Sequence, residues 1–268
     1  MKIFNGKKEA EKILSDLKKK TTKYKEKPKL AVISTGSDPA SELFIRNKKR
    51  AAKKAGIEVI RCKLKKEKEI LKKIRDFNKE KEISGIIVQL PLPKKFNTNK
   101  IIKEISSKKD VDGLGENSPF SSPFITAIEI ALKEALKKIK NKKILALVNS
   151  DIFGRKLRDF FKKKKIKIDY FLKKKSYPRN KIKEADIIIT ACGVPNQIEG
   201  KYIKEKVILI DGGITLLKNK KIVGDVNKKR LKNKPSFLTP VPGGIGPLTV
   251  ALLLKNTLIG FKKYGKHS

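Results

Sequence analysis

Short apolar runs alternate along this chain with longer stretches in which apolar residues recur at helical spacing. Such runs are typical of buried strands in a parallel sheet, and the longer stretches of helices that cross between the strands. The first half predicts strands at 29–34, 57–62 and 85–90, and helices at 40–55 and 67–78. The second half predicts strands at 143–148, 166–171, 187–191 and 207–210, and helices at 125–139, 154–163 and 247–261. We therefore expect an α/β protein, with a domain boundary where Gly, Asn, Ser and Pro cluster at 115–124.

The charge is the unusual feature of the composition. Among 268 residues, 68 are Lys or Arg and 27 are Asp or Glu, which gives a formal net charge of +41. A basic surplus is typical of nucleic-acid-binding proteins, because cationic side chains neutralise phosphates. Here the lysines are spread over the whole chain, and the few aromatic residues are not interleaved with them as in single-strand binders. The even spread favours tolerant surface positions over nucleic-acid binding, which stays open as an alternative.

Other residue types exclude several classes of site. Cys62 and Cys192 lie far apart, and the single histidine is His267, so we expect no disulfide framework, no metal site and no His-based triad. No apolar run approaches the roughly 18 residues of a membrane span, and residues 1–6 lack an apolar signal-peptide core. The sequence therefore predicts a cytoplasmic protein without a membrane partner.

Three segments concentrate residues with special chemistry. VQLPLP at 88–93 puts the Gln89 amide at the carboxyl end of a strand, where α/β sheets bind ligands, or else ends the strand in a rigid turn. KDVDGL at 109–114 places Asp112 before a glycine, which also suits a plain acidic turn. LTPVPGGIGPLT at 238–249 combines prolines and glycines before a helix, and such a loop presents backbone amides to a ligand.

These segments resemble, in this order, the bifunctional methylenetetrahydrofolate dehydrogenase/methenyltetrahydrofolate cyclohydrolase (FolD) family. The resemblance extends to GSDPAS at 36–41, ADIIITACGVP at 185–195, IDGGIT at 210–215 and IVGDV at 222–226, and it covers nearly the whole chain. It implies an N-terminal α/β catalytic domain of residues 1–118, completed by a C-terminal helix at 246–268. A Rossmann-type NAD(P)-binding domain would span 119–245, with a folate cleft between the two domains. The family also implies a folate substrate and a homodimer.

The resemblance assigns roles to individual residues. The family's catalytic Tyr-x-x-x-Lys reads Phe44 to Lys48 here, and this spacing puts both side chains on one helix face. Lys48 would handle protons, Gln89 would orient it, and Asp112 would hydrogen-bond the pterin ring. The loop with Pro242, Gly243 and Gly244 would close over the folate and the cofactor.

The cofactor side departs from the family pattern. The family's Gly-Arg-Ser-x-x-Val-Gly-x-Pro reads VNSDIFGRK at 148–156, so Val148 replaces the first glycine and Asn149 replaces the arginine, while Ser150 is kept. Lys173 and Lys175 would supply the lost phosphate contacts, and Gly193 and Ile214 complete the implied cofactor set. The family favours NADP. Asp169, expected near the end of the second strand, would instead favour NAD through a ribose hydroxyl.

The implied activity is oxidation of 5,10-methylenetetrahydrofolate with NADP, followed by hydrolysis of the methenyl product to 10-formyltetrahydrofolate. Two alternatives remain open. Loss of the hydroxyl at Phe44 and of the glycine at Val148 would leave a cyclohydrolase with weakened dehydrogenase activity. The charge would suit a nucleic-acid-binding protein built on the same fold.

Overall fold

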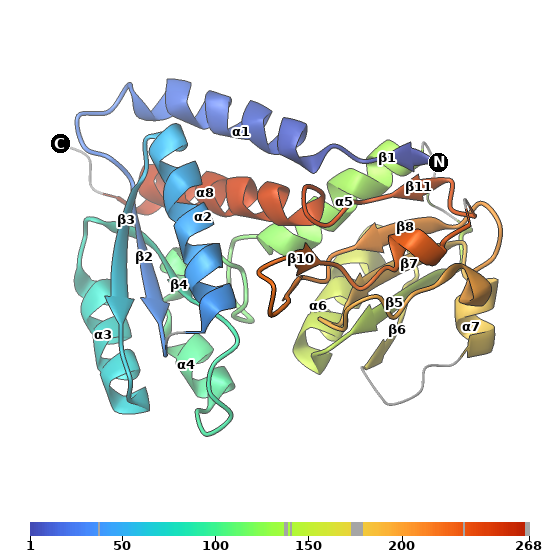
Figure 1. The fold of residues 1–268 in the computed structure, drawn as a ribbon. Coiled ribbons are helices and arrows are strands. Elements are labelled where there is room, and N and C mark those ends of the chain that lie inside the picture. The colour runs from blue at the N-terminus through green and yellow to red at the C-terminus, as the bar shows by residue number, and fades with distance from the viewer. Residues whose placement is uncertain (37, 137–138, 140, 173–178, 233, 266–268) are drawn as a thin grey trace. The chain divides into compact units, whose positions relative to one another are not determined.

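The chain forms two compact units, each with its own parallel sheet. A computed structural model describes residues 1–268 except 37, 137–138, 140, 173–178, 233 and 266–268 (Figure 1). Glu9–Pro123 and Thr249–Ser268 make up the three-stranded unit, and Met1–Lys8 and Phe124–Leu248 make up the six-stranded unit. The expectation of a two-domain α/β fold is therefore confirmed.

The sheet of the three-stranded unit is covered by helices on both faces. Its parallel strands lie in the order β3 (Glu58–Lys63), β2 (Lys29–Ser34) and β4 (Ile83–Val88). On one face, β2 packs Leu30 and Val32 in a core with residues of α1 (Gly6–Thr21), α2 (Pro39–Ala55) and α8 (Ile245–Tyr264). On the other, its Ala31 and Ile33 meet α3 (Glu67–Lys79) and α4 (Thr98–Glu104). Burial on both faces explains why these strands read as continuous apolar runs.

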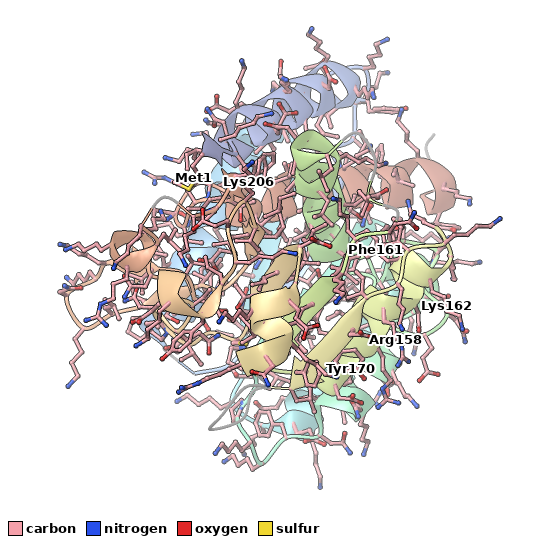
Figure 2. The ribbon with its side chains drawn as sticks, turned by 90° about the vertical axis from the view of Figure 1, so that its right-hand side faces the viewer. Met1, Arg158, Phe161, Lys162, Tyr170 and Lys206 are labelled. Atoms are coloured by element: carbon pink, nitrogen blue, oxygen red, sulfur yellow. The ribbon has the colours of Figure 1, made fainter. Side chains whose placement is uncertain are left out.

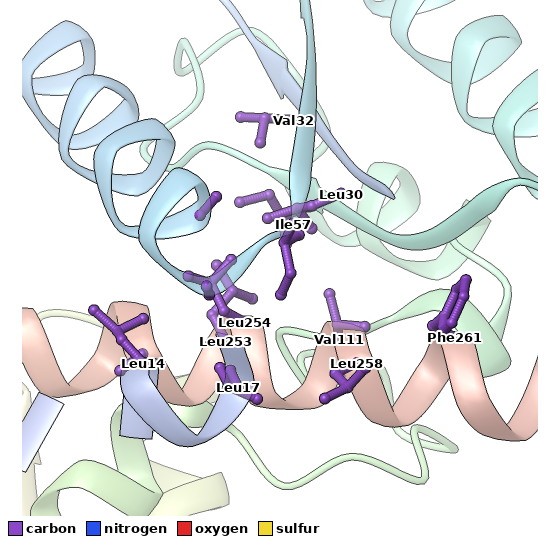
Figure 3. Packing of buried hydrophobic residues seen from close by; sticks show 14 of the residues in the cluster. Leu14, Leu17, Leu30, Val32, Ile57, Val111, Leu253, Leu254, Leu258 and Phe261 are labelled. Atoms are coloured by element: carbon purple, nitrogen blue, oxygen red, sulfur yellow. The ribbon is translucent and has the colours of Figure 1, made fainter. Parts of the chain in front are cut away.

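Helix α8 is the centre of the first of these cores. Figure 3 shows its Leu253, Leu254, Leu258 and Phe261 in the cluster with Val111 and residues of α1 and β2. Among the described residues, α8 is the one helix long and apolar enough to cross a membrane by length and composition. The expectation that no stretch reaches this length is wrong. The apolar side chains of α8 are instead used in packing, and 56% of its apolar window is buried.

The ends of α2 are set by local chemistry. Asp38 caps the first turn, because its carboxylate accepts hydrogen bonds from the Ser41 amide at 2.9 Å and the Ser41 hydroxyl at 3.0 Å. Pro39 stands at a first-turn position, where its missing N–H costs nothing. The helix ends at Gly56, whose φ of 70° is left-handed. Asp38 and Pro39 of the GSDPAS segment therefore start the helix that carries Phe44 and Lys48.

The six-stranded unit has a doubly wound sheet. All its strands are parallel. They lie in the order β1 (Lys2–Ile3), β11 (Phe237–Leu238), β8 (Ile208–Asp211), β7 (Ile187–Ala191), β5 (Ile144–Val148) and β6 (Asp169–Leu172). The chain leaves β5 for β6 on one side and returns to β7 on the other. This reversal is the switch point at which such sheets bind ligands.

The other elements of this unit connect the strands. Helices α5 (Pro123–Ala135), α6 (Asp151–Lys162) and α7 (Arg179–Glu184) lie between them in the chain, and β9 (Thr215–Leu216) pairs antiparallel with β10 (Ile222–Val223). Single turns of 3₁₀-helix occur at η1 (Ser107–Lys109) in the three-stranded unit and at η2 (Gly200–Tyr202) and η3 (Lys228–Arg230) in this one.

The hydrophobic pattern finds the long elements and misses the short or lysine-rich ones. All the expected strands form, with bounds shifted by a few residues, and α6 begins earlier than expected, at Asp151. Helices α1, α4 and α7 and the strands β1, β9, β10 and β11 were not expected. Strands of two residues carry no readable alternation, and lysines dominate the sequence of α1. Because β1 pairs with β11, residues 1–8 belong to the six-stranded unit and not to the expected domain 1–118.

Candidate functional site

The carboxyl end of β4 holds a lysine against an amide. The ammonium of Lys48, on α2, donates a hydrogen bond to Gln89 Oε1 at 2.6 Å. Gln89 extends β4 by one residue, since its backbone N–H donates to Ile33 O at 2.8 Å, and its own amide nitrogen donates to Leu90 O at 2.7 Å. The Gln89 side chain is therefore fixed from both ends, and so is the position of the Lys48 nitrogen. Phe44 lies one helical turn before Lys48 and is half-buried.

The two aspartates of KDVDG have different roles. Asp110 is 1% exposed, and its carboxylate accepts hydrogen bonds from the backbone N–H groups of Leu114 and Gly115 at 3.3 and 2.7 Å. It therefore provides the acidic turn. Asp112 is half-buried, and within the described part of the chain its carboxylate accepts no hydrogen bond. This leaves Asp112 available to a ligand.

Two contacts hold the loop that carries Asp112. The Val111 side chain packs on Gly85 of β4, where an added Cβ would lie 2.6 Å from a Val111 methyl, so only glycine allows this approach. Asn256 of α8 donates its amide hydrogens to Val111 O at 2.9 Å and Ser121 O at 3.0 Å. Sequence reasoning missed Asn256, because nothing near it in the sequence marks it as polar support for a loop 145 residues away.

Burial changes the protonation of Lys48 and Asp112. Desolvation lowers the pKa of Lys48, and the nearby Asp112 carboxylate partly opposes this. Desolvation also raises the pKa of Asp112 to about 6. The charge of Lys48 lowers this pKa, and the charge of Asp110 raises it. Near neutral pH the site therefore pairs an ionised carboxylate with an amine that gives up its proton more easily than a surface lysine. Such an amine can act as a general base.

The six-stranded unit presents an open helix N-terminus at the end of β5. Asn149 and Ser150 form the whole connection from β5 to α6, and the Ser150 side chain makes no capping hydrogen bond. The first backbone N–H groups of α6 thus point out of the sheet edge at its switch point, which suits a phosphate. Val148, expected in contact with the cofactor, is a fully buried strand residue.

Gly154 lets α6 lie close to the sheet. An added Cβ at Gly154 would lie 2.4 Å from the Tyr170 ring of β6. The same ring is held by its hydroxyl, which donates to Asp151 Oδ1 at 2.7 Å, and by the Arg158 guanidinium 5.6 Å from its centroid (Figure 2). Close helix–strand packing at this position is the role of the last glycine in a dinucleotide-binding loop.

The other expected cofactor and loop residues lie in the same unit. Gly193 follows β7 with a φ of 63° and open space on its side-chain side, and Ile214 follows β8, where an added Cβ at Gly246 would lie 3.4 Å from its side chain. Pro242 is exposed, the Gly243 carbonyl accepts from the Lys7 amide at 3.1 Å, and Gly244 packs on Gly6.

The remaining expectations have mixed outcomes. Lys173 and Lys175 lie outside the described residues. Asp169 is the first residue of β6 and is exposed, so it stands at the amino end of the strand. The expectation that it stands near the end of the strand is wrong, and this removes the argument for a ribose contact, because ligands bind at the carboxyl end. Among the described residues no group of three or more Cys, His, Asp or Glu suits a metal ion, and neither Cys62 nor Cys192 forms a disulfide there.

Comparisons with known proteins agree with this geometry. Residues 4–112 match the family model for the catalytic domain of tetrahydrofolate dehydrogenase/cyclohydrolase, and residues 125–265 match that for its NAD(P)-binding domain. Over 279 residues the chain is 36% identical to the bifunctional protein FolD of Rickettsia bellii, an alignment covering 98% of this chain and 99% of the relative.

Solved structures give the same match. The crystal structure of the bifunctional enzyme FolD from Campylobacter jejuni has a TM-score of 0.87 at 32% identity, over 98% of this chain and 99% of that one. The Trypanosoma brucei enzyme, solved with NADP and an inhibitor, has a TM-score of 0.88 at 26% identity, over 97% of each chain. The resemblance read from the motifs is confirmed.

The contact between Gly154 and Tyr170 predicts non-additive stability effects. Gly154→Ala should lower the free energy of unfolding by about 1–3 kcal/mol, because its methyl group collides with the ring. In a Tyr170→Ala background the same change should be neutral or stabilising, because alanine favours a helix over glycine by about 1 kcal/mol. Urea unfolding of the wild type, the two single variants and the double variant measures the coupling energy between Gly154 and Tyr170. An equal cost of Gly154→Ala in both backgrounds would contradict the packing role.

Proposed function

Because the chain belongs to the tetrahydrofolate dehydrogenase/cyclohydrolase family, we propose that it oxidises 5,10-methylenetetrahydrofolate and hydrolyses the product to 10-formyltetrahydrofolate. The observation that carries the proposal is the hydrogen bond from Lys48 to Gln89, with the Asp112 carboxylate close enough to change the pKa of Lys48. The catalytic domain would be the three-stranded unit of Glu9–Pro123 and Thr249–Ser268, and the cofactor domain the six-stranded unit of Met1–Lys8 and Phe124–Leu248, in place of the expected 1–118 with 246–268 and 119–245.

In the hydrolysis, water adds to the carbon between the two nitrogens of the methenyl cation. The water must lose a proton as its oxygen forms the new C–O bond, and Lys48 is the group we assign to accept it. The adduct's hydroxyl then gives up the second proton of the water as its C–O bond becomes the formyl C=O. One C–N bond breaks in the same step, so the formyl group stays on the other nitrogen and the freed nitrogen takes up that proton. Gln89 keeps the amine in place through these transfers, and Asp112 would accept hydrogen bonds from N–H groups of the pterin.

In the oxidation, NADP supplies the acceptor for the hydride that leaves the methylene carbon. Asn149, Ser150 and the start of α6 would bind the phosphates of NADP. Gly193 and Ile214 would line the site of its nicotinamide half. The Trypanosoma brucei relative, solved with NADP, supports this cofactor over NAD. The loss of Asp169 as a ribose ligand removes the sequence argument for NAD. Lys173 and Lys175 remain proposed phosphate ligands.

Phe44 and Val148 support a second candidate, a cyclohydrolase with weakened dehydrogenase activity. Phe44 has no hydroxyl to position the substrate, and buried Val148 offers no close backbone approach to phosphates. We further propose a cytoplasmic homodimer without membrane or nucleic-acid partners. Size-exclusion chromatography with light scattering tests the dimer.

Two absorbance assays test the function. Purified protein is incubated with 5,10-methylenetetrahydrofolate and either NADP or NAD while the methenyl product is followed, and the decay of added methenyl substrate is then recorded. Formation with NADP and decay faster than in buffer would support both activities. Decay without formation would favour the cyclohydrolase candidate. The absence of both formation and decay would refute an enzymatic role.

The role of Lys48 predicts that Lys48→Gln lowers the cyclohydrolase kcat by about 100-fold or more, the usual contribution of a positioned proton acceptor. Lys49→Gln is the matched control, because Lys49 is exposed on the same helix. It should retain the wild-type rate. The decay of methenyl substrate at saturation measures both variants, and a Lys48→Gln protein with more than a tenth of the wild-type kcat would contradict the assignment.

The electrostatic coupling to Asp112 predicts a shifted pH profile. Above pH 6 the Asp112 carboxylate is ionised and favours the charged form of Lys48, so the pKa of Lys48 is higher than it would be without that charge. In Asp112→Asn the amine should lose its proton at lower pH, and the rising limb of the cyclohydrolase kcat should move down by about one pH unit. Profiles at saturating substrate measure this. A limb that stays in place or moves up would refute the coupling.

Restoring the hydroxyl at Phe44 should raise dehydrogenase activity. In Phe44→Tyr, one added hydrogen bond worth about 1 kcal/mol predicts a kcat/KM several-fold higher. Phe96→Tyr, at another half-buried ring of the same unit, is the control and should stay near the wild-type value. Initial rates of methenyl formation measure kcat/KM for both variants. Equal values would mean that the missing hydroxyl does not limit the dehydrogenase activity.

A further inference from the structure

Two buried aspartates lie behind the loops at the carboxyl edge of the six-stranded sheet. Asp225 is 0% exposed, and its carboxylate accepts hydrogen bonds from the Cys192 amide at 2.7 Å, the Val194 amide at 2.8 Å and the Thr190 hydroxyl at 2.6 Å. The two amides flank Gly193. One carboxylate therefore sets the backbone on both sides of the glycine that follows β7.

Asp211 does the same for the loop after β8. Its carboxylate accepts from the backbone N–H groups of Gly213 at 3.0 Å, Asp225 at 3.1 Å and Val226 at 3.0 Å. Gly213 immediately precedes Ile214. Asp211 also fixes the backbone of the segment that holds the other carboxylate, so the two loops are connected through this pair.

Thr239 ties a third segment to the pair. Its hydroxyl accepts from the Asp211 amide at 2.7 Å and donates to Asp211 O at 3.1 Å. Thr239 is the residue after β11 and the first before Pro240, where the PVPGGIGP loop begins. The network thus reaches every loop of the β7, β8 and β11 edge.

The acceptor pattern requires carboxylates. In each aspartate both oxygens accept a hydrogen bond from a backbone N–H. An asparagine would turn an NH₂ group toward one of these donors and leave both unsatisfied. The neighbouring glycines leave room for these carboxylates. An added Cβ at Gly213 would lie 2.2 Å from Asp225, and one at Gly224 would lie 2.0 Å from Asp211.

These carboxylates are costly to bury. Burial and the nearby Asp225 raise the pKa of Asp211 to about 7, and no lysine or arginine is among the groups that shift it. Hydrophobic residues would fill the space at lower cost if packing were the only requirement. Three of the donors that the pair orders, the amides of Cys192, Val194 and Gly213, belong to the loops after β7 and β8, which points to a role in the shape of those loops.

We propose that Asp211 and Asp225 are positioning residues that hold the loops after β7 and β8 in the conformation that receives the nicotinamide half of NADP. The phosphates are assigned to the start of α6, and in doubly wound sheets the adenosine half lies toward the second strand, here β6. The nicotinamide half then passes over β7 and β8. This inference rests on the proposed function for the identity of the cofactor.

Asp225→Asn is the main test. It should raise the Kd for NADP, measured by calorimetry, and the KM for NADP by about tenfold or more, while cyclohydrolase kcat stays within twofold because Lys48, Gln89 and Asp112 belong to the other unit. Thr190→Val is a milder variant that removes one donor to the carboxylate and should raise the Kd about threefold. It keeps the proposal testable if Asp225→Asn does not fold.

Glu129→Gln is the control for lost stability. Glu129 is a buried acid of the same unit, 7% exposed, and it pairs with Lys133 and Lys164, away from the loops after β7 and β8. It should lower Tm without changing the Kd for NADP. If Asp225→Asn and Thr190→Val change the Kd no more than Glu129→Gln does, the positioning role is refuted.

The calorimetric readout separates this inference from the proposed function. A wild-type protein that binds NADP but turns over no folate, with weakened binding in Asp225→Asn, would refute the function and support the positioning role. A wild-type protein that does not bind NADP would refute both.

Discussion

The parallel arrangement of strands is the constraint on which both units depend. Parallel strands all end at the same edge, so side chains and loops that follow different strands meet there although they are far apart in the chain. In the three-stranded unit this edge joins Gln89 to Lys48, which comes from the helix after the neighbouring strand. In the six-stranded unit it joins the loops after β5, β7, β8 and β11. The same arrangement buries each central strand on both faces, which is why the sequence between these edges is so uniformly apolar.

The parts of the site that were predictable from sequence are those carried by local signals. Gln89 stands out as a polar residue ending an apolar strand, whereas Lys48 was assigned through the family's Tyr-x-x-x-Lys pattern after GSDPAS. The Asp211 and Asp225 pair was not predictable, because its partners are backbone N–H groups of loops whose paths only the fold defines. The glycines of IDGGIT were read as part of a family motif, whereas Gly213 makes room for a buried carboxylate.

The acids that this basic chain contains are informative because they are few, 27 against 68 lysines and arginines. Asp38, Asp110, Asp211 and Asp225 each accept hydrogen bonds from backbone N–H groups. A lysine offers no acceptor and an asparagine only one oxygen, so neither can take over where both oxygens are used. Exposed surface positions carry no such requirement and tolerate lysine.

The path of the chain has a consequence for the order of events at the ribosome. The loop with Asp112 is held by Asn256, and the core around Leu30 and Val32 is closed by α8. Both supports are made last, after more than a hundred residues of the other unit. The three-stranded unit, although most of it is made before the bulk of the other unit, therefore completes its core late, with apolar surface exposed until α8 emerges.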